Sequence, residues 1–210
     1  MLYRDRIEAA KLLARKLERY RHRRPLVLGI PRGAVPMAAV IASYLGGDLD
    51  VVLVRKLGAP EQPEFAVGAV SEDGAVWIDP RLEELGVSID VVKESAAREL
   101  DVIRSRRRLF SGGLPPVDAG GRNVIVVDDG TATGFTMIAA VRYLRRQAPR
   151  RIIAALAVAS PPAFSKIVAE VDDVECLDVR ADFAAVGQWF EDFSEVTDEE
   201  VTSILARPRV

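Results

Sequence analysis

The chain has 210 residues, of which 49% are hydrophobic and 29% charged, so it can bury one sizeable core without division into domains. Lys and Arg total 29 against 31 Asp and Glu, a balance that favours neither nucleic acid nor an anionic membrane as a partner. Cys176 is the only cysteine, which excludes a disulfide framework, and no run approaches the roughly 20 apolar residues of a membrane span. The charged N-terminus does not resemble a signal peptide, so a cytoplasmic location is expected.

An apolar strand and a turn with one cation follow the first, charged helix. Residues 26–30 (Leu-Val-Leu-Gly-Ile) predict the strand, and 31–36 (Pro-Arg-Gly-Ala-Val-Pro) form a turn before an apolar helix over 37–45. Arg32 beside Gly33 offers a guanidinium and an exposed amide at the end of the strand. Taken alone, this segment is also compatible with an ordinary connection whose arginine is solvated.

Basic residues also follow the next predicted strand. Residues 50–54 are apolar after Asp50, and Arg55 and Lys56 stand at the carboxyl end of that strand, where they could meet phosphates or simply be solvated. Residues 58–64 are rich in turn formers and charge, which predicts a mobile surface segment. Two short strands, 65–70 and 75–78, are joined by Ser-Glu-Asp-Gly and predict an antiparallel hairpin.

The middle of the chain predicts one long charged helix over residues 88–110. Its arginine-rich end, 104–108, is expected to be solvated, because basic residues are favourable near a helix C-terminus; a phosphate or subunit contact is the alternative. Residues 112–121 form a linker within the domain, and His22 is expected at the surface.

The most informative segment covers residues 123–136. Residues 124–127 (Val-Ile-Val-Val) predict a strand buried on both faces of a parallel sheet, and Asp128 and Asp129 follow at its carboxyl end. Two adjacent acids beside a hydrophobic run repel each other unless hydroxyl donors or a cation share their charge. A ribose would supply the hydroxyl donors, and magnesium would supply the cation. The loop that follows can converge backbone amides and hydroxyls on one anion. The residues expected to bind a phosphate are Gly130, Thr131, Ala132, Thr133, Gly134 and Thr136.

Other motifs do not fit these residues. A Walker A loop needs four residues between its glycines and then lysine, whereas three separate Gly130 from Gly134 and Phe135 follows. No dinucleotide fingerprint follows any predicted strand. A receiver domain needs an acid at the end of a later strand, where this chain has Ser160. A plain polar turn is the remaining alternative.

The last third continues the alternation of strands and helices. Thr133 is expected to cap a helix over 134–147, and a strand over 151–158, a helix over 162–171 and a strand over 174–179 follow. Cys176 in the last strand is expected to be a small buried hydrophobe. Aromatic residues then gather between 182 and 193, either as core or as the wall of a site.

Residues 124–136 resemble the phosphoribosyl pyrophosphate (PRPP) motif of the type I phosphoribosyltransferases, and the order of elements is similar over nearly the whole chain. The resemblance implies an α/β fold with a twisted parallel sheet flanked by helices. It implies a single domain over 1–210, with a core of about 1–172 and a small C-terminal hood of about 173–210. Similar proteins commonly form dimers, so a homodimer is expected.

The resemblance also implies roles for residues. Asp128 and Asp129 would form the catalytic pair that holds the ribose hydroxyls, and Mg²⁺ would be held by PRPP and water beside them without a firm protein ligand. The loop after them would cradle the 5′-phosphate, and a segment near 58–64 would close over PRPP. Pyrophosphate would be bound by Arg32, Gly33, Ala34, Arg55 and Lys56. The acceptor would be bound by Phe183, Val186, Gly187 and Trp189.

The expected function is magnesium-dependent transfer of phosphoribosyl from PRPP to a nitrogenous base or related amine, with release of pyrophosphate. The 6-oxopurine members of the family have Asp where this chain has Ala132, so the motif is closer to that of the adenine and orotate enzymes. The sequence does not identify the acceptor. An unusual amine or a specialised metabolite is also possible as the acceptor. The alternative is a protein of the same fold that senses PRPP or a nucleotide without turnover.

Overall fold

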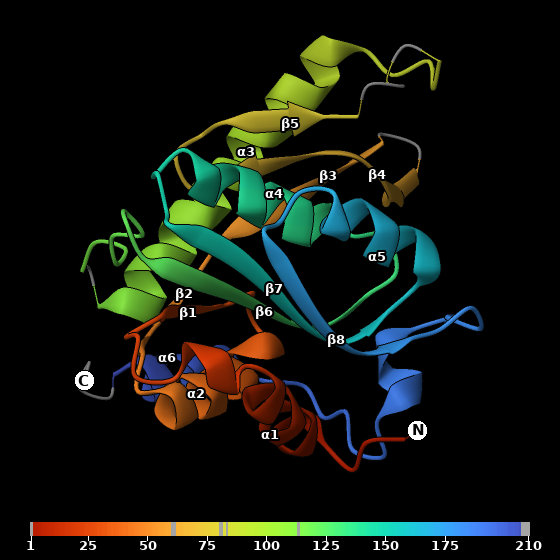
Figure 1. The fold of residues 1–210 in the computed structure, drawn as a ribbon. Helices are drawn as coiled ribbons and strands as arrows, with labels where there is room; N and C mark the ends of the chain where they lie inside the picture. Colours follow the sequence, from red (N-terminus) through yellow and green to blue (C-terminus); the bar gives the residue numbers. More distant parts are fainter. Residues whose placement is uncertain (1, 60–61, 80–81, 83, 113, 207–210) are drawn as a thin grey trace.

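Five parallel strands form the central sheet of the computed structural model (Figure 1). The structure describes residues 2–59, 62–79, 82, 84–112 and 114–206, with the backbone alone for 62–66. The strand order is β2-β1-β6-β7-β8, and β1, β6 and β7 are almost entirely buried because helices cover both faces. The predicted α/β fold is therefore confirmed. The strands are β1 (Leu26–Gly29), β2 (Asp48–Val51), β6 (Asn123–Thr131), β7 (Arg151–Ala159) and β8 (Asp173–Val179).

Helices on the two faces bury two hydrophobic clusters. On one face, α1 and α2 pack against Ile125 and Val127 of β6; on the other, α4 and α5 pack against Val124 and Val126. Figure 1 shows α1, α2 and α6 below the sheet and α3, α4 and α5 above it. The helices are α1 (Arg6–Lys16), α2 (Ala34–Leu45), α3 (Ile89–Ser111), α4 (Phe135–Arg145), α5 (Pro161–Val168) and α6 (Asp198–Leu205), with short 3₁₀ turns η1 (Glu18–Tyr20) and η2 (Val186–Trp189).

A second, antiparallel sheet lies above the first. Its strands are β3 (Val54–Ala59), β4 (Gln62–Ser71) and β5 (Val76–Ile78), and α3 packs on it. The hairpin between β4 and β5 is confirmed. In the segment expected to be a mobile surface segment, residues 58, 59 and 62–64 belong to paired strands, and residues 60 and 61 lie outside the described part. Turn-forming residues here pair across an irregular register.

The structure also corrects the strand predicted over 50–54 and the boundary predicted for the hood. β2 ends at Val51 and β3 begins at Val54, so the single strand expected over 50–54 is two strands in different sheets. β8 pairs with β7 along its length, so this strand, which the boundary near 172 assigned to the hood, belongs to the central sheet.

Charged and polar residues outside the motif mostly lie where they were expected. His22 is exposed, and burial raises the pKa of the half-buried Cys176 thiol to about 12. Arg107 differs from the other residues of 104–108: its guanidinium is largely buried and bonds Asp50 Oδ1 at 3.0 Å and Glu72 Oε1 at 2.5 Å. The expectation of a solvated arginine is wrong at this position, because α3 turns it toward Asp50 in β2 and Glu72 in the turn after β4. None of the described helices is long and apolar enough to span a membrane.

Candidate active site

Adjacent strands bring the turn after β1 and the acid pair of β6 together. Gly29 is in register with Val127, and the Ile30 amide donates to the Val127 carbonyl at 3.0 Å. From β1 the chain continues to β2 on one side, and from β6 to β7 on the other. Ligands of open α/β sheets bind at such a switch point, outside the carboxyl ends of the strands.

Gly33 makes direct contact between these two segments possible. A Cβ atom at Gly33 would lie 2.1 Å from Oδ2 of Asp129, so a side chain there would collide with the carboxylate. Within the described residues, the amides of Arg32 and Gly33 donate no hydrogen bond, whereas Ala34 is fully buried as the first residue of α2. The turn therefore offers two backbone donors beside the acid pair.

The two acids lie inside β6 rather than after it, since this strand continues to Thr131. Burial raises the pKa of Asp128 well above its ordinary value, and the neighbouring charge of Asp129 raises it further. Burial also raises the pKa of Asp129, whereas the hydrogen bond and charge of the Arg6 guanidinium lower it. Both carboxylates are thus costly to ionise, and a cation or several hydroxyl donors would stabilise their charged form.

Arg6 is a member of this site that the sequence did not reveal. Its Nε donates to Oδ2 of Asp129 at 2.8 Å, and its Nη1 donates to the Ser194 carbonyl at 2.8 Å. The guanidinium also lies 3.7 Å from the centroid of the Phe193 ring. Arg6 stands 123 positions from Asp129, and no local pattern distinguishes it from the other arginines of the first helix.

Two side-chain hydroxyl groups fix the loop that follows the acids. The Gly134 amide donates to Oγ1 of Thr131 at 2.9 Å, and Oγ of Ser160 donates to the Ala132 carbonyl at 2.7 Å. Gly134, with φ of 79°, is the residue that precedes α4, so Thr133 does not cap that helix as expected and is exposed instead. A positive φ suits glycine.

Backbone donors without partners lie in the loop after the acids and at the start of α4. Among the described residues, no acceptor bonds the amides of Ala132, Thr133, Phe135 or Thr136. The first amides of a helix lack partners within it, and the helix dipole adds partial positive charge at the same place. This loop can therefore bind an anion such as a phosphate.

The basic residues predicted for pyrophosphate separate into three positions. Arg32 bonds the Glu195 carboxylate, and its Nη1 lies 3.7 Å from Asp198 Oδ1, so the C-terminal segment holds this guanidinium. Arg55 Nε lies 2.6 Å from Glu99 Oε2 on α3. Lys56 is exposed, and its charge lowers the pKa of Asp128. Neighbouring residues of a strand point to opposite faces, which explains why Arg55 and Lys56 diverge.

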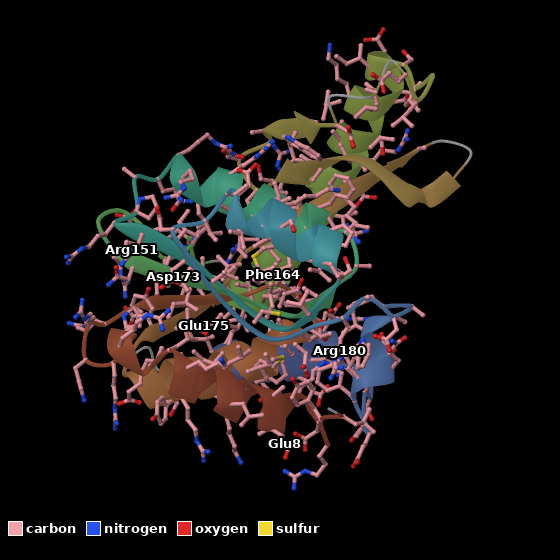
Figure 2. The ribbon with its side chains drawn as sticks, turned by 45° about the vertical axis from the view of Figure 1, so that its right-hand side comes forward. Glu8, Arg151, Phe164, Asp173, Glu175 and Arg180 are labelled. Carbon is pink, nitrogen blue, oxygen red and sulfur yellow. The ribbon has the colours of Figure 1, made fainter. Side chains whose placement is uncertain are left out.

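The predicted acceptor residues also divide. Val186 approaches the loop, because a Cβ atom on Gly130 would lie 2.7 Å from Cγ1 of Val186. Gly187 packs against the Phe193 ring, and Phe183 is half-buried. Trp189 instead packs on the core cluster that α1 and α2 form with the sheet, with the Arg180 guanidinium 4.9 Å from the centroid of its ring. Figure 2 shows Arg180 beside this part of the chain.

Residues 3–188 match the family model described as phosphoribosyl transferase domain. The chain belongs to the phosphoribosyl transferase family. This phosphoribosyl transferase domain includes the whole central sheet and the candidate site except for the segment after residue 188.

Relatives agree with the family assignment. A protein from Mycobacterium tuberculosis named "Putative phosphoribosyl transferase" is 36% identical over 208 residues, which cover 98% of this chain and 47% of that protein. The phosphoribosyl transferase chain thus spans about half the length of the curated relatives it matches. TT1426 from Thermus thermophilus is 46% identical in its crystal structure, with a TM-score of 0.84 and 98% of each chain covered. A hypothetical protein from Neisseria gonorrhoeae with bound ppGpp shares the fold at 14% identity and a TM-score of 0.52, with 98% of this chain and 97% of that chain covered.

Proposed function

We propose that the protein transfers the phosphoribosyl group of PRPP to a nitrogenous base or related amine, with Mg²⁺ as cofactor and pyrophosphate as the leaving group. The observation that carries this proposal is the set of unpaired amides at the start of α4, directly after the acid pair that the Gly33 turn contacts. A phosphate, a ribose and a diphosphate could be bound side by side there.

The 5′-phosphate would be bound by residues 130–134 and Thr136. The amides of Ala132, Thr133 and Thr136 are free to donate to it, and Phe135 adds another amide. Thr131 contributes by fixing Gly134, since its hydroxyl already accepts a bond from the Gly134 amide. Anion binding at a helix N-terminus needs no charged side chain.

Asp128 and Asp129 would accept hydrogen bonds from the ribose hydroxyls. Their raised pKa values make them sites where hydroxyl donors or a cation are stabilising. The described residues contain no group of three or more acidic, His or Cys side chains able to hold a metal ion. Mg²⁺ would be held by PRPP and water beside these two carboxylates, because this ion usually keeps several waters and binds substrate phosphates. When bound, this ion would neutralise charge on the departing diphosphate.

The diphosphate would lie against the turn of Arg32, Gly33 and Ala34, with Lys56 nearby. The free amides of Arg32 and Gly33 are its donors, and release of Arg32 from Glu195 would add a guanidinium. Arg55 is left out of this part of the proposal because Glu99 engages it. The acceptor would enter beside Val186 and Gly187, the hood residues nearest the loop, with Phe183 and Trp189 in support.

Pyrophosphate release from PRPP with a panel of bases and amines, with and without Mg²⁺, tests the proposal. Magnesium-dependent release with one acceptor would support it, and the Asp128→Asn/Asp129→Asn variant should then bind no PRPP while staying folded. Normal PRPP binding by this folded variant would refute the assigned site. Tight binding of PRPP or a nucleotide with no turnover across the panel would favour the sensor instead.

The homodimeric state and cytoplasmic location expected from the sequence also belong to this proposal. Size-exclusion chromatography with light scattering tests the first.

A further inference from the structure

A cavity of about 660 Å³ lies at the amino ends of the strands of the central sheet. Cavities of roughly 300–1,000 Å³ are typical of small-molecule sites. Asp48 begins β2 and Asn123 begins β6, while Arg150 directly precedes β7. The side chains that matter for its chemistry are Arg23, Arg24, Asp48, Arg122, Asn123 and Arg150.

The charges around this cavity are unbalanced. Four arginines face one aspartate, and Arg122 already bonds Asp48 Oδ2 at 2.6 Å and the Arg24 carbonyl at 2.9 Å. In the described part of the chain, Arg23, Arg24 and Arg150 form no ion pair with any residue. These three arginines are exposed to solvent, so their guanidinium groups are available to an anion that enters the cavity.

The side chain of Asn123 adds a hydrogen-bonding group to the cavity. Asn123 is 7% exposed and lines the cavity, yet its side chain forms no hydrogen bond with any described residue. Alternation along β6 places it on the face of Ile125 and Val127, which pack under α1, and Arg23 and Arg24 follow that helix and η1. The side-chain amide of Asn123 is therefore available to donate a hydrogen bond to a molecule bound in the cavity.

This cavity is separate from the candidate active site. Asn123 and Asp129 are six positions apart along β6, a separation of about 20 Å in an extended strand. Figure 2 shows Arg151, at the start of β7, and Arg180, just after β8, at opposite ends of the sheet. A ligand in the cavity therefore would not compete with one at the acid pair.

We propose that this arginine cavity binds a small anion with two linked phosphate groups, either free diphosphate or the diphosphate of a nucleotide. Several guanidinium groups on different segments match more than one phosphate, and each can donate two parallel hydrogen bonds to phosphate oxygens. The lining contains no aromatic side chain on which a base could stack, so recognition rests on the phosphates.

The test is a titration of ¹⁵N-labelled protein with inorganic pyrophosphate, and separately with ADP, without Mg²⁺. We expect saturable shifts of the backbone amides of Gly121, Arg122 and Asn123, distinct from any shifts at Gly33 and Thr133. Arg150→Ala and Asn123→Asp should each weaken the response at the cavity at least tenfold and leave the response at Gly33 unchanged. Tighter binding of pyrophosphate would identify free diphosphate as the ligand, and tighter binding of ADP would identify a nucleotide.

Arg151→Ala is the matched control, because Arg151 is the exposed neighbour of Arg150 and does not line the cavity. It should retain wild-type affinity. Equal weakening by Arg150→Ala and Arg151→Ala would indicate general charge attraction and overturn the proposal, as would shifts confined to the acid-pair end or binding of a short RNA in place of both small anions. Because the titration uses no PRPP, its result is independent of transferase activity. Thermal melting of each variant identifies any that fails to fold, and for such a variant Arg23→Ala replaces it.

Discussion

Arg6 Nε lies 2.8 Å from Oδ2 of Asp129, and this ion pair joins the first helix to the acid pair of the PRPP motif. Both side chains are largely buried, at 12% and 14% exposure. The same guanidinium bonds the Ser194 carbonyl, so one side chain connects the N-terminal helix, the central strand and the hood. Three segments distant in sequence therefore meet at one carboxylate.

Arg6→Ala should weaken PRPP binding by about tenfold and lower the free energy of unfolding by about 1–3 kcal/mol, because a buried hydrogen-bonded charge loses its partner. Calorimetric titration and urea denaturation measure the two effects. Arg4→Ala is the control, since its side chain is 65% exposed and pairs, among the described residues, with adjacent Asp5 alone. Equal effects of both variants would show that the Asp129 contact has no special role.

Asp128→Asn should abolish PRPP binding yet stabilise the protein above acidic pH. The pKa of Asp128 is raised in the folded state, so its stability contribution is fully present below the ordinary value of 3.8 and is lost as pH rises through the raised pKa. Removing the charge should raise Tm by roughly 2–4 °C at pH 8, equivalent to about 1 kcal/mol. Near pH 4 the difference should vanish. Scanning calorimetry at both pH values checks this, with the exposed Asp101→Asn as control; a lower Tm for Asp128→Asn at pH 8 would contradict it.

Gly33→Ala should destabilise the protein by about 1–3 kcal/mol, because the added methyl group would meet the Asp129 carboxylate. Adding Asp129→Ala should restore stability without restoring PRPP binding, and the resulting double-mutant cycle measures the coupling. Gly120→Ala, where a Cβ atom would come no closer than 3.3 Å to the Asp118 side chain, should change stability by less than about 0.5 kcal/mol. Additive effects of Gly33→Ala and Asp129→Ala would refute the contact.

Glu195→Gln should tighten PRPP binding modestly by releasing Arg32. Glu195 is 74% exposed, and exposed ion pairs contribute about 0–1 kcal/mol, which limits the gain to about fivefold. The gain should disappear in 1 M salt, where the Debye length is about 3 Å. Titrations at low and high salt measure it, with the exposed Glu191→Gln as control. Weaker binding by Glu195→Gln would mean that this contact holds Arg32 in its binding position.

Local patterns in the sequence predicted the central sheet and the PRPP motif. The apolar run over 124–127, its two acids and the glycine loop act within fourteen residues, so their geometry follows from strand and helix rules. The register that brings Gly33 against Asp129 follows from the pairing of β1 with β6, which a parallel sheet makes available. The exact neighbour of each carboxylate does not follow from such patterns.

Contacts between distant segments account for what the sequence could not predict. Arg6, Arg32 and Arg107 all have carboxylate partners on other elements, and charge runs alone favoured solvated arginines in the last case. Arg55 and Lys56 were both predicted to bind pyrophosphate because they are adjacent in the sequence. In β3 of the second sheet, however, their side chains point to opposite faces. The partners of these charged side chains are set by tertiary contacts, which composition does not predict.

Pairing of the chain's first residues with the hood bears on when the site can form during synthesis. The Tyr3 amide donates to the Trp189 carbonyl, and the Glu191 and Asp192 amides donate to the carbonyls of Tyr3 and Arg4. A nascent chain that has emerged only through β7 already contains both acids and Arg6 but lacks the hood to which Arg6 bonds. Long-range contacts of this kind slow folding. We therefore expect ligand binding to appear on the ribosome only after residue 194 has left the exit tunnel, well after the central strands are complete.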